Sequence, residues 1–267
     1  MSDPDAGAVG GTEVDLTPDV DRGSSADRGF PSEREVLHGG ESRAETRVAE
    51  GSRTGATGSG DGWAANRGAP GALVVIISGP SGVGKDTIIA ELRARNPGAR
   101  RHYVVTCATR ERRRGEHDGV DYHFLSQSDF ARMREAGALL EANDVHGNWY
   151  GTPRDQVVDA LRRGEDAILK IDVKGAHAVR ARVPEALLIF VVPPSPDELR
   201  KRLVARSTET PEQLERRFAD AAVELASQGD YDHVVVNETG EVGRTAEEIE
   251  GIIAAEHAQH PGRRIRI

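Results

Sequence analysis

The chain has 267 residues, a formal net charge of −9 and only 4% aromatic residues, an acidic balance that argues against a general nucleic-acid-binding protein. A single cysteine, Cys107, excludes an intramolecular disulfide and a cysteine-based zinc cage, and the nine histidines form no HExxH motif. Because no apolar run approaches the roughly 20 residues that span a bilayer, and no signal-peptide pattern opens the chain, we expect a cytoplasmic protein without a membrane partner.

Residues 1–70 are predicted to form a disordered acidic tail. They contain 13 of the chain's 30 glycines, and their 13 acidic residues outnumber 7 arginines. A segment with so little apolar surface cannot offset the entropy that ordering would cost. Either a regulatory arm or a plain solvated tail fits this composition, and the solvated tail is the simpler interpretation.

The stretch 73–92 predicts a strand, a glycine-rich turn and the start of a helix. The β-branched run at 73–77 is typical of a strand buried on both faces of a parallel sheet. Gly79, Gly82 and Gly84 allow a sharp turn whose amides point at one anion together with the helix N-terminus. The G-x-x-x-x-G-K spacing that ends at Lys85 matches the phosphate-binding P-loop. The alternative is an ordinary strand-to-helix turn.

One position departs from the P-loop pattern. Asp86 follows Lys85, where a serine or threonine usually helps to hold Mg²⁺. The Asp86 carboxylate, the Thr87 hydroxyl or water are each able to supply the missing oxygen ligand.

Downstream of this loop, strand patterns alternate with helical patterns. We expect strands at 73–78, 102–107, 167–171, 187–192 and 233–236, and helices at 86–95, 127–136, 153–163, 174–182, 196–206, 211–226 and 245–257. This alternation predicts an α/β fold with a parallel central sheet flanked by helices. Ligands of such sheets bind at the carboxyl ends of strands, so the P-loop, 106–110 and Asp172 are expected at one cleft. Short strand signals between 122 and 150 indicate a small inserted subdomain.

A basic loop follows the second predicted strand. Four arginines lie within the five positions 110–114 of an otherwise acidic chain. Guanidinium forks match phosphate geometry, whereas the alternative is a solvated basic loop. A second phosphate site beside a P-loop is what a nucleoside monophosphate kinase needs to hold its acceptor.

The motifs over 73–255 resemble those of the guanylate kinases. They are ISGPSGVGKDTI, T-x-x-T-R-x-x-R-x-G-E-x-D-G-x-D-Y-x-F at 106–124, Glu141 followed by GNWYGT, IDVKGA at 171–176, RSTET at 206–210 with Arg217 beyond it, and VVVN at 234–237. The resemblance implies a P-loop nucleoside monophosphate kinase fold with a GMP-binding subdomain and a helical lid. It also implies phosphorylation of GMP, and of dGMP, by ATP with Mg²⁺, in guanine nucleotide salvage and recycling.

The resemblance assigns the GMP site to hydroxyls, arginines and carboxylates. Its members are Thr106, Arg110, Arg113, Tyr122, Glu141, Tyr150, Thr152 and Asp172. The arginines and tyrosines would bind the GMP phosphate, and Glu141 would accept hydrogen bonds from the guanine ring N–H and exocyclic amine. Adenine lacks that donor pair, so the buried carboxylate would be left unpaired with AMP.

The resemblance also assigns the ATP site and the groups that act on the transferred phosphoryl. The ATP-binding residues are Gly79, Pro80, Ser81, Gly82, Val83, Gly84, Lys85, Asp86, Thr87 and Asn237. The catalytic residues are Lys85, Arg110, Arg206 and Arg217. Asp86 is the candidate Mg²⁺ ligand.

Composition and resemblance together divide the chain into a tail at 1–70, a kinase domain at 71–258 and a basic tail at 259–267. Within the kinase domain we expect a core at 71–105, 164–195 and 227–258. The GMP-binding subdomain takes about 106–152 and the lid about 196–226. The protein is expected to be a monomer or a homodimer.

Three residues depart from the family pattern. Asp86 replaces a serine or threonine, and Ser207 replaces a glycine. Lys170 stands where the family more often has an acid. In its P-loop aspartate and the basic residue before the I-D motif, the chain is similar to the plastid-type branch. Two alternatives to a GMP kinase are a ribose 1,5-bisphosphate kinase with a similar P-loop and a non-catalytic domain that binds protein partners. The retained guanine-reading and P-loop residues argue against both.

Overall fold

The computed structural model describes residues 68–145, 147–205 and 210–267. The tail expected at 1–70 thus lies almost wholly outside the described residues. The strands are β1 Val74–Ser78, β2 Arg101–Tyr103, β3 Cys107–Ala108, β4 His123–Phe124, β5 Leu139–Val145, β6 Asn148–Pro153, β7 Asp166–Lys170, β8 Leu187–Val192 and β9 His233–Val236. The α-helices are α1 Lys85–Arg95, α2 Gln127–Glu135, α3 Arg154–Arg162, α4 Val173–Arg182, α5 Pro196–Ala205, α6 Pro211–Ala226 and α7 Val242–Gln259. A 3₁₀ turn, η1, spans Ser227–Asp230.

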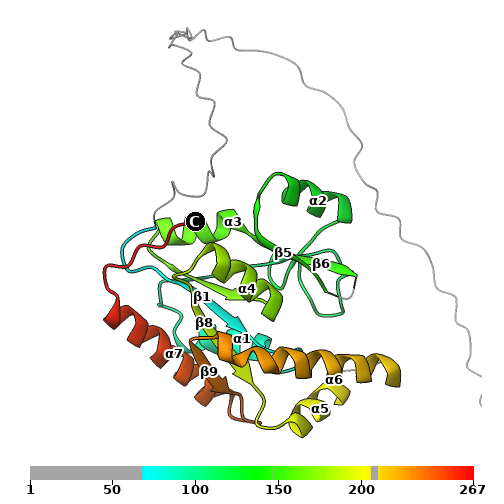
Figure 1. The fold of residues 1–267 in the computed structure, drawn as a ribbon. Helices are drawn as coiled ribbons and strands as arrows, with labels where there is room; N and C mark the ends of the chain where they lie inside the picture. Colours follow the sequence, from blue (N-terminus) through cyan, green and yellow to red (C-terminus); the bar gives the residue numbers. More distant parts are fainter. Residues whose placement is uncertain (1–67, 146, 206–209) are drawn as a thin grey trace, which may run out of the picture. The chain divides into compact units, whose positions relative to one another are not determined.

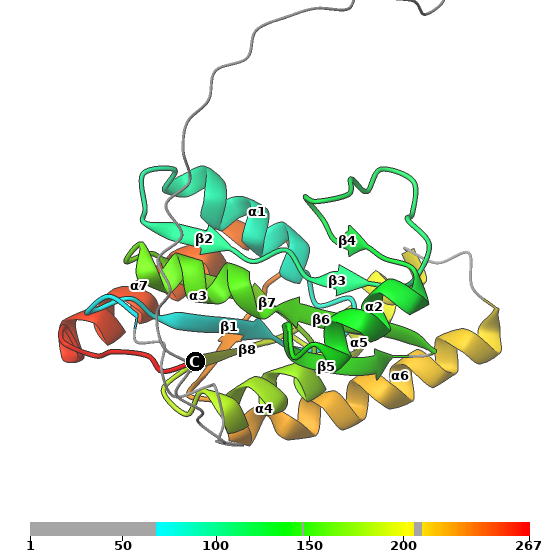
Figure 2. The same cartoon turned by 90° about the horizontal axis from the view of Figure 1, so that it is seen from above.

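The central sheet has five parallel strands in the order β2-β7-β1-β8-β9, which confirms the predicted α/β fold. All five residues of β1 are buried, because helices cover both faces of the sheet. Val74 and Ile76 pack toward α3 and α4, whereas Val75 and Ile77 pack toward α1 and α7. Figures 1 and 2 show this arrangement, with α1 and α4 on opposite sides of the sheet. Burying each such side chain contributes about 1.5–3 kcal/mol, so β1 is the centre of the core.

A second, four-stranded sheet in the order β4-β3-β6-β5 lies between β2 and α3 in the sequence. The pairing of β3 with β4 is parallel, and the pairings of β6 with β3 and β5 are antiparallel. Its own small core forms where Phe130 of α2 packs on Cys107 and Leu139. Short strand signals in this region therefore came from a real, separate sheet (Figure 1).

The prediction of a single strand at 102–107 is wrong, because the chain passes from the central sheet to the second sheet there. β2 ends at Tyr103 in the central sheet, and β3 starts at Cys107 in the second sheet. Between them the side-chain amide of Gln156 on α3 accepts from Val105 N at 3.0 Å and donates to Val105 O at 3.0 Å. This amide replaces the strand partner that the backbone loses at the crossing. The run at 102–107, whose pattern predicts one strand, therefore forms parts of two.

The segment expected as a basic C-terminal tail packs against the domain. Helix α7 runs to Gln259, and Ile265 and Ile267 are buried in the core beside α3 and α4. The backbone N–H of Gly68 donates to Ile265 O at 3.2 Å, and that of Gly71 donates to Arg263 O at 2.9 Å. These backbone hydrogen bonds tie the last residues to the chain just before β1, and the two isoleucines anchor them in the core.

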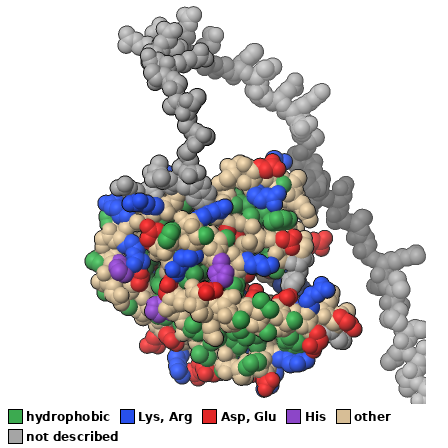
Figure 3. Space-filling model, in the orientation of Figure 1, with side chains coloured by type: hydrophobic (Ala, Val, Ile, Leu, Met, Phe, Trp, Pro, Cys, Tyr) green, Lys and Arg blue, Asp and Glu red, His purple; other side chains and the backbone are tan. Residues whose placement is uncertain are grey.

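Helices α5 and α6 follow β8, and a small cluster that includes Leu199, Leu203 and Ala221 packs between them. A capping box at Thr210 starts α6. On the face drawn in Figure 3, hydrophobic side chains gather low on the molecule, and Val204 and Val223 of these helices are exposed. Within the described residues, no helix is long and apolar enough to cross a membrane.

Candidate active site

The glycine-rich loop leaves β1 at Gly79 and enters α1 at Lys85. Gly79 has φ +138° and Gly84 has φ +104°, conformations that side-chain-bearing residues rarely adopt. A Cβ at Gly79 would overlap the carbonyl of Val191, and one at Gly84 would lie 2.5 Å from the amide nitrogen of Asn237. Both glycines are therefore required by the close packing of this loop against β8 and β9.

Lys85 folds back over this loop. Its Nζ donates to Gly79 O at 2.5 Å and to Pro80 O at 3.1 Å. Burial lowers the pKa of Lys85, while the carboxylates of Glu224, Asp86 and Asp172 partly offset that effect. The ammonium thus sits in a partly desolvated position that a phosphate group would stabilise.

Helix α6 reaches the loop through two charged residues. Arg217 donates from Nη2 to Ser81 Oγ at 2.8 Å, and Glu224 accepts from Ser81 N at 3.3 Å. Arg217 therefore lies beside the glycine-rich loop, where it was expected. Glu224 was not predicted, since a glutamate on a charged helix carries no signal of its own. Arg206, the other arginine expected here, lies outside the described residues.

Asn237 supports the loop from behind. The buried side chain donates from Nδ2 to Val83 O at 2.8 Å and accepts from Thr245 Oγ1 at 3.1 Å. Arg202 of α5 donates to Val83 O at 3.3 Å and to Asn237 O at 3.0 Å. Both polar atoms of the Asn237 amide are thus used within the protein. Sequence reasoning missed Arg202 and Thr245, because only the fold places them beside the loop.

Glu141 is the buried carboxylate of the second sheet, with 4% of its surface exposed. Its Oε1 accepts from Thr152 Oγ1 at 2.7 Å and its Oε2 from Asn143 Nδ2 at 2.6 Å. Burial, with a contribution from Asp172, raises the pKa of Glu141 to about 7 although these two hydrogen bonds act in the opposite direction. Asn143 was missed, yet residues two apart on a strand share one face, so the spacing could have indicated it.

Asp172 caps the N-terminus of α4, where its Oδ1 accepts from Gly175 N at 2.7 Å. A Cβ on Gly175 would lie 3.1 Å from Asp172 Oδ1 and 3.3 Å from Glu141 Oε2. The absence of a side chain at Gly175 therefore lets the helix end approach both carboxylates, and it brings the two sheets together at this point.

Arg110 lies against Tyr122, and Tyr122 lies against Tyr150. The guanidinium forms a fork-to-fork ion pair with Glu116, at 2.7 Å and 2.5 Å. Its Cζ lies 4.9 Å from the ring centroid of Tyr122, which packs edge-on against Tyr150 at 6.0 Å. The pair with Glu116 raises the pKa of Arg110, and burial raises that of Tyr150. Arg113 is exposed, and its backbone N–H donates to the same Glu116 at 2.8 Å.

Two of the departures from the family pattern meet in space. Lys170 Nζ lies 2.5 Å from Asp86 Oδ1 and 4.9 Å from the ring centroid of Tyr122. The pair lines a cavity of about 320 Å³ whose other walls include Thr106. Among the described residues, no group of three or more His, Cys, Asp or Glu side chains could hold a metal ion. Mg²⁺ in nucleotide sites often binds only one protein carboxylate, together with phosphate oxygens and water. Asp86 is a carboxylate of this kind.

Most of the expected site residues therefore lie at the carboxyl ends of β1 and β7 in the central sheet, in or beside the second sheet, or on α6. Of the expected ATP-site residues, Ser81 in the loop and Thr87 in the first turn of α1 are exposed, whereas Val83 is buried. Thr106 is buried at the crossing between the two sheets. Contacts link the two halves of the site, because Lys170 joins the α1 turn to Tyr122.

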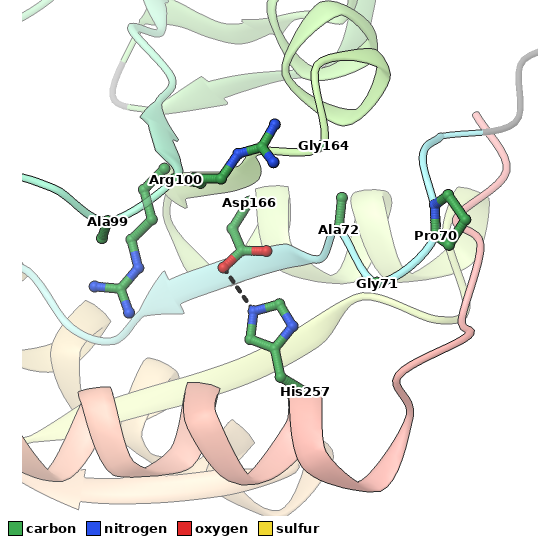
Figure 4. A pocket seen from close by; sticks show the side chains of 9 residues that line it. Pro70, Gly71, Ala72, Ala99, Arg100, Gly164, Asp166 and His257 are labelled. Carbon is green, nitrogen blue, oxygen red and sulfur yellow. Dashed lines mark hydrogen bonds and ion pairs between the residues drawn. The ribbon is translucent and has the colours of Figure 1, made fainter.

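A different cavity, of about 350 Å³, lies at the opposite, amino-terminal ends of the strands. Figure 4 shows Asp166 and His257 within it, and their contact is 2.9 Å long. Asp166 also accepts from Leu73 N at 3.0 Å. These contacts fasten α7 to the start of β1, so the aspartate is accounted for by its structural role.

Comparison with known proteins gives one consistent result. The family described as Guanylate kinase matches residues 72–256. A guanylate kinase of Symbiobacterium thermophilum is 45% identical over 190 residues, which is 71% of this chain and 88% of that protein. One from Thermobifida fusca is 43% identical over 70% of this chain and 93% of its own length. The crystal structure of guanylate kinase from Anaplasma phagocytophilum aligns with a TM-score of 0.58 and 31% identity, covering 69% of this chain and 86% of that one.

Proposed function

Because this chain belongs to the guanylate kinase family, we infer that it transfers a phosphoryl group from ATP to GMP and releases ADP and GDP. The observation that carries the choice of acceptor is the buried Glu141, held between Thr152 and Asn143 at one end of the cleft.

Glu141 reads the acceptor base in this proposal. Guanine presents a ring N–H and an amine on one edge, and an ionised carboxylate accepts from both. Thr152, Asn143 and Asp172 fix the Glu141 side chain or lie beside it, so its orientation is set before the ligand arrives. AMP would leave this desolvated carboxylate without the two guanine donors, at a cost of about 1–3 kcal/mol or more. Thr106 supplies a further hydroxyl to the base.

The acceptor phosphate binds to Arg110, Arg113 and the hydroxyls of Tyr122 and Tyr150. In the free protein, Glu116 occupies the guanidinium fork of Arg110. A phosphate offers the same two-oxygen geometry, so GMP would take over this fork or share it with the carboxylate. The exposed Arg113 has room to turn toward the ligand.

The donor phosphates bind to backbone N–H groups of the loop 79–87, in which only Pro80 lacks one, and the Lys85 ammonium exchanges its carbonyl partners for phosphate oxygens. Arg217, and Arg206 from outside the described residues, balance the charge that develops on the transferred group. Asn237 contributes to ATP binding by holding the loop in shape through Val83. Helices α5 and α6 serve as the lid, and its closure with the second sheet excludes water from the transfer.

We further propose that Mg²⁺ accompanies ATP, with Asp86 as a protein ligand beside phosphate oxygens and water. When bound, the metal neutralises donor phosphate charge. The protein's own contribution is to align the two substrates and to stabilise charge. A strong general base is not required, since the GMP phosphate already carries negative charge.

Several finer points belong to the same proposal. The acceptor also includes dGMP, and the reaction serves guanine nucleotide salvage and recycling. We place the protein in the cytoplasm, where a lone thiol such as Cys107 stays reduced. We propose that the protein is a monomer or a homodimer. The pairing of Asp86 with Lys170 supports a branch of the family with a P-loop aspartate, similar to the plastid type.

A coupled ADP-release assay tests the proposed function. The full-length chain receives ATP and Mg²⁺ with GMP, dGMP, AMP, UMP or ribose 1,5-bisphosphate in separate reactions. We expect rapid turnover with GMP and dGMP and little with AMP or UMP. Turnover with the sugar bisphosphate alone would move the protein to another kinase class. No turnover by the folded protein with any acceptor would favour a partner-binding domain.

A further inference from the structure

Lys170 is the last residue of β7, and its side chain lies between the two substrate sites. Only 20% of the Lys170 side chain is exposed, whereas its partner Asp86 is 74% exposed. The Nζ atom is 2.5 Å from Asp86 in the first turn of α1 and 4.9 Å from the ring centroid of Tyr122, which immediately precedes β4. The ammonium thus reaches from the end of the donor loop to the acceptor side of the cleft.

Two cations from different parts of the chain lie against the ring of Tyr122. The guanidinium carbon of Arg110 also lies 4.9 Å from the ring centroid of Tyr122. Each cation has a carboxylate partner in this structure, Glu116 for Arg110 and Asp86 for Lys170. Like charges gathered at one side chain repel unless nearby anions neutralise them. Two cations that converge on one ring, each with a carboxylate, are therefore an arrangement suited to a bound anion.

We propose that Lys170 is a phosphate-binding residue of the acceptor site: its ammonium contacts the phosphate of bound GMP, and Asp86 holds it in place in the free protein. This inference rests on the proposed function, because it takes Tyr122 and Arg110 as the acceptor-phosphate site.

A cation at this position would reduce the repulsion between the phosphates of the two substrates. Transfer brings a dianionic acceptor phosphate close to the donor triphosphate, and the two repel. A charged group that reaches both the start of α1 and Tyr122 offsets that repulsion at the point where the substrates meet. The alternative is that the Lys170–Asp86 pair only ties α1 to β7. That alternative predicts the same loss for ligands with and without a phosphate.

Equilibrium binding separates these two roles. Calorimetry is done with GMP and with guanosine, without ATP and Mg²⁺, so that donor and metal sites do not contribute. In Lys170→Met, we expect GMP affinity to fall about 10- to 100-fold, the range of one charge-assisted hydrogen bond, and guanosine affinity to stay as in wild type. Lys170→Arg should retain most of the GMP affinity. Lys201→Met removes the same charge from a side chain that is 78% exposed on α5, and it should change neither ligand.

A second readout follows the ligand itself. A nearby ammonium lowers the second pKa of the bound GMP phosphate, which ³¹P NMR titration measures directly. Lys170→Met should move that pKa back toward the value of free GMP. Asp86→Asn should leave the phosphate pKa low, because the ammonium then no longer pairs with the Asp86 carboxylate.

Two results would overturn the proposal. One is a Lys170→Met protein that binds GMP as wild type does, with an unchanged phosphate pKa. The other is an equal loss of GMP and guanosine affinity. A wild-type protein that binds neither ligand would instead contradict the proposed function, so the two failures are distinguishable.

Discussion

Replacing Glu141 by glutamine should make the ligand-free protein more stable at high pH while weakening GMP binding. Burial raises the pKa of Glu141 from its ordinary 4.5 to about 7 in the folded protein. The folded state therefore holds this proton more tightly than the unfolded state does. The stabilisation from protonated Glu141 is complete below pH 4.5 and is lost as pH rises through about 7.

The structure sets the size of this effect. The difference between 4.5 and about 7 corresponds to about 3 kcal/mol of unfolding free energy above pH 8, of which about 2 kcal/mol develops between pH 5.5 and 8.5. Glutamine has nearly the same shape and no charge, and the Thr152 hydroxyl can rotate to accept from it. Glu141→Gln should thus gain up to about 3 kcal/mol over wild type at pH 8.5 and much less at pH 5.5.

Urea denaturation at both pH values measures the stability, and calorimetry measures GMP affinity. An amide cannot accept from both guanine donors, so we expect GMP affinity to fall at least about 10-fold. Glu135→Gln, an exposed change on α2, is the matched control and should show no pH-dependent difference. The reasoning fails if Glu141→Gln is destabilised at pH 8.5, or if the stability difference between variant and wild type is the same at both pH values.

Three further changes test other parts of the structure. Lys85→Ala should lower turnover by roughly two orders of magnitude or more with a near-normal urea midpoint; unchanged turnover would remove Lys85 from the transfer step. Gly79→Ala should destabilise by more than about 2 kcal/mol, since a Cβ there overlaps the Val191 carbonyl and φ is +138°; a wild-type melting temperature would contradict this packing. Ile265→Ala should cost about 2–4 kcal/mol in thermal unfolding, whereas a free C-terminal tail would tolerate it.

Local patterns predicted the strand, glycine-rich turn and helix at 73–92 and most of the order of elements. The β-branched run of β1, the glycines after it and the apolar spacing of α1 are signals within about 20 consecutive residues, so each is readable without the fold. The α6 boundaries at 211–226 and the β8 boundaries at 187–192 were predicted as they occur. Assignments of roles to the site residues came from motif resemblance and remain predictions for the experiments above.

Other properties depend on residues far apart in the sequence, and only the tertiary structure decides them. The strand expected at 102–107 divides because Gln156 meets Val105 where the chain leaves one sheet for the other. The C-terminal residues are buried because Ile265 and Ile267 pack in the core beside α3 and α4.

The same holds for the charges of the site. Asp86 and Lys170 are 84 positions apart, and each alone reads as a departure from a family pattern; in the fold they form one ion pair. The raised pKa of Glu141 likewise follows from burial beside Asp172, which no local pattern records. Motifs report which chemical groups a chain carries, but pKa values and ion pairs depend on distance and desolvation, and these exist only once the chain has folded.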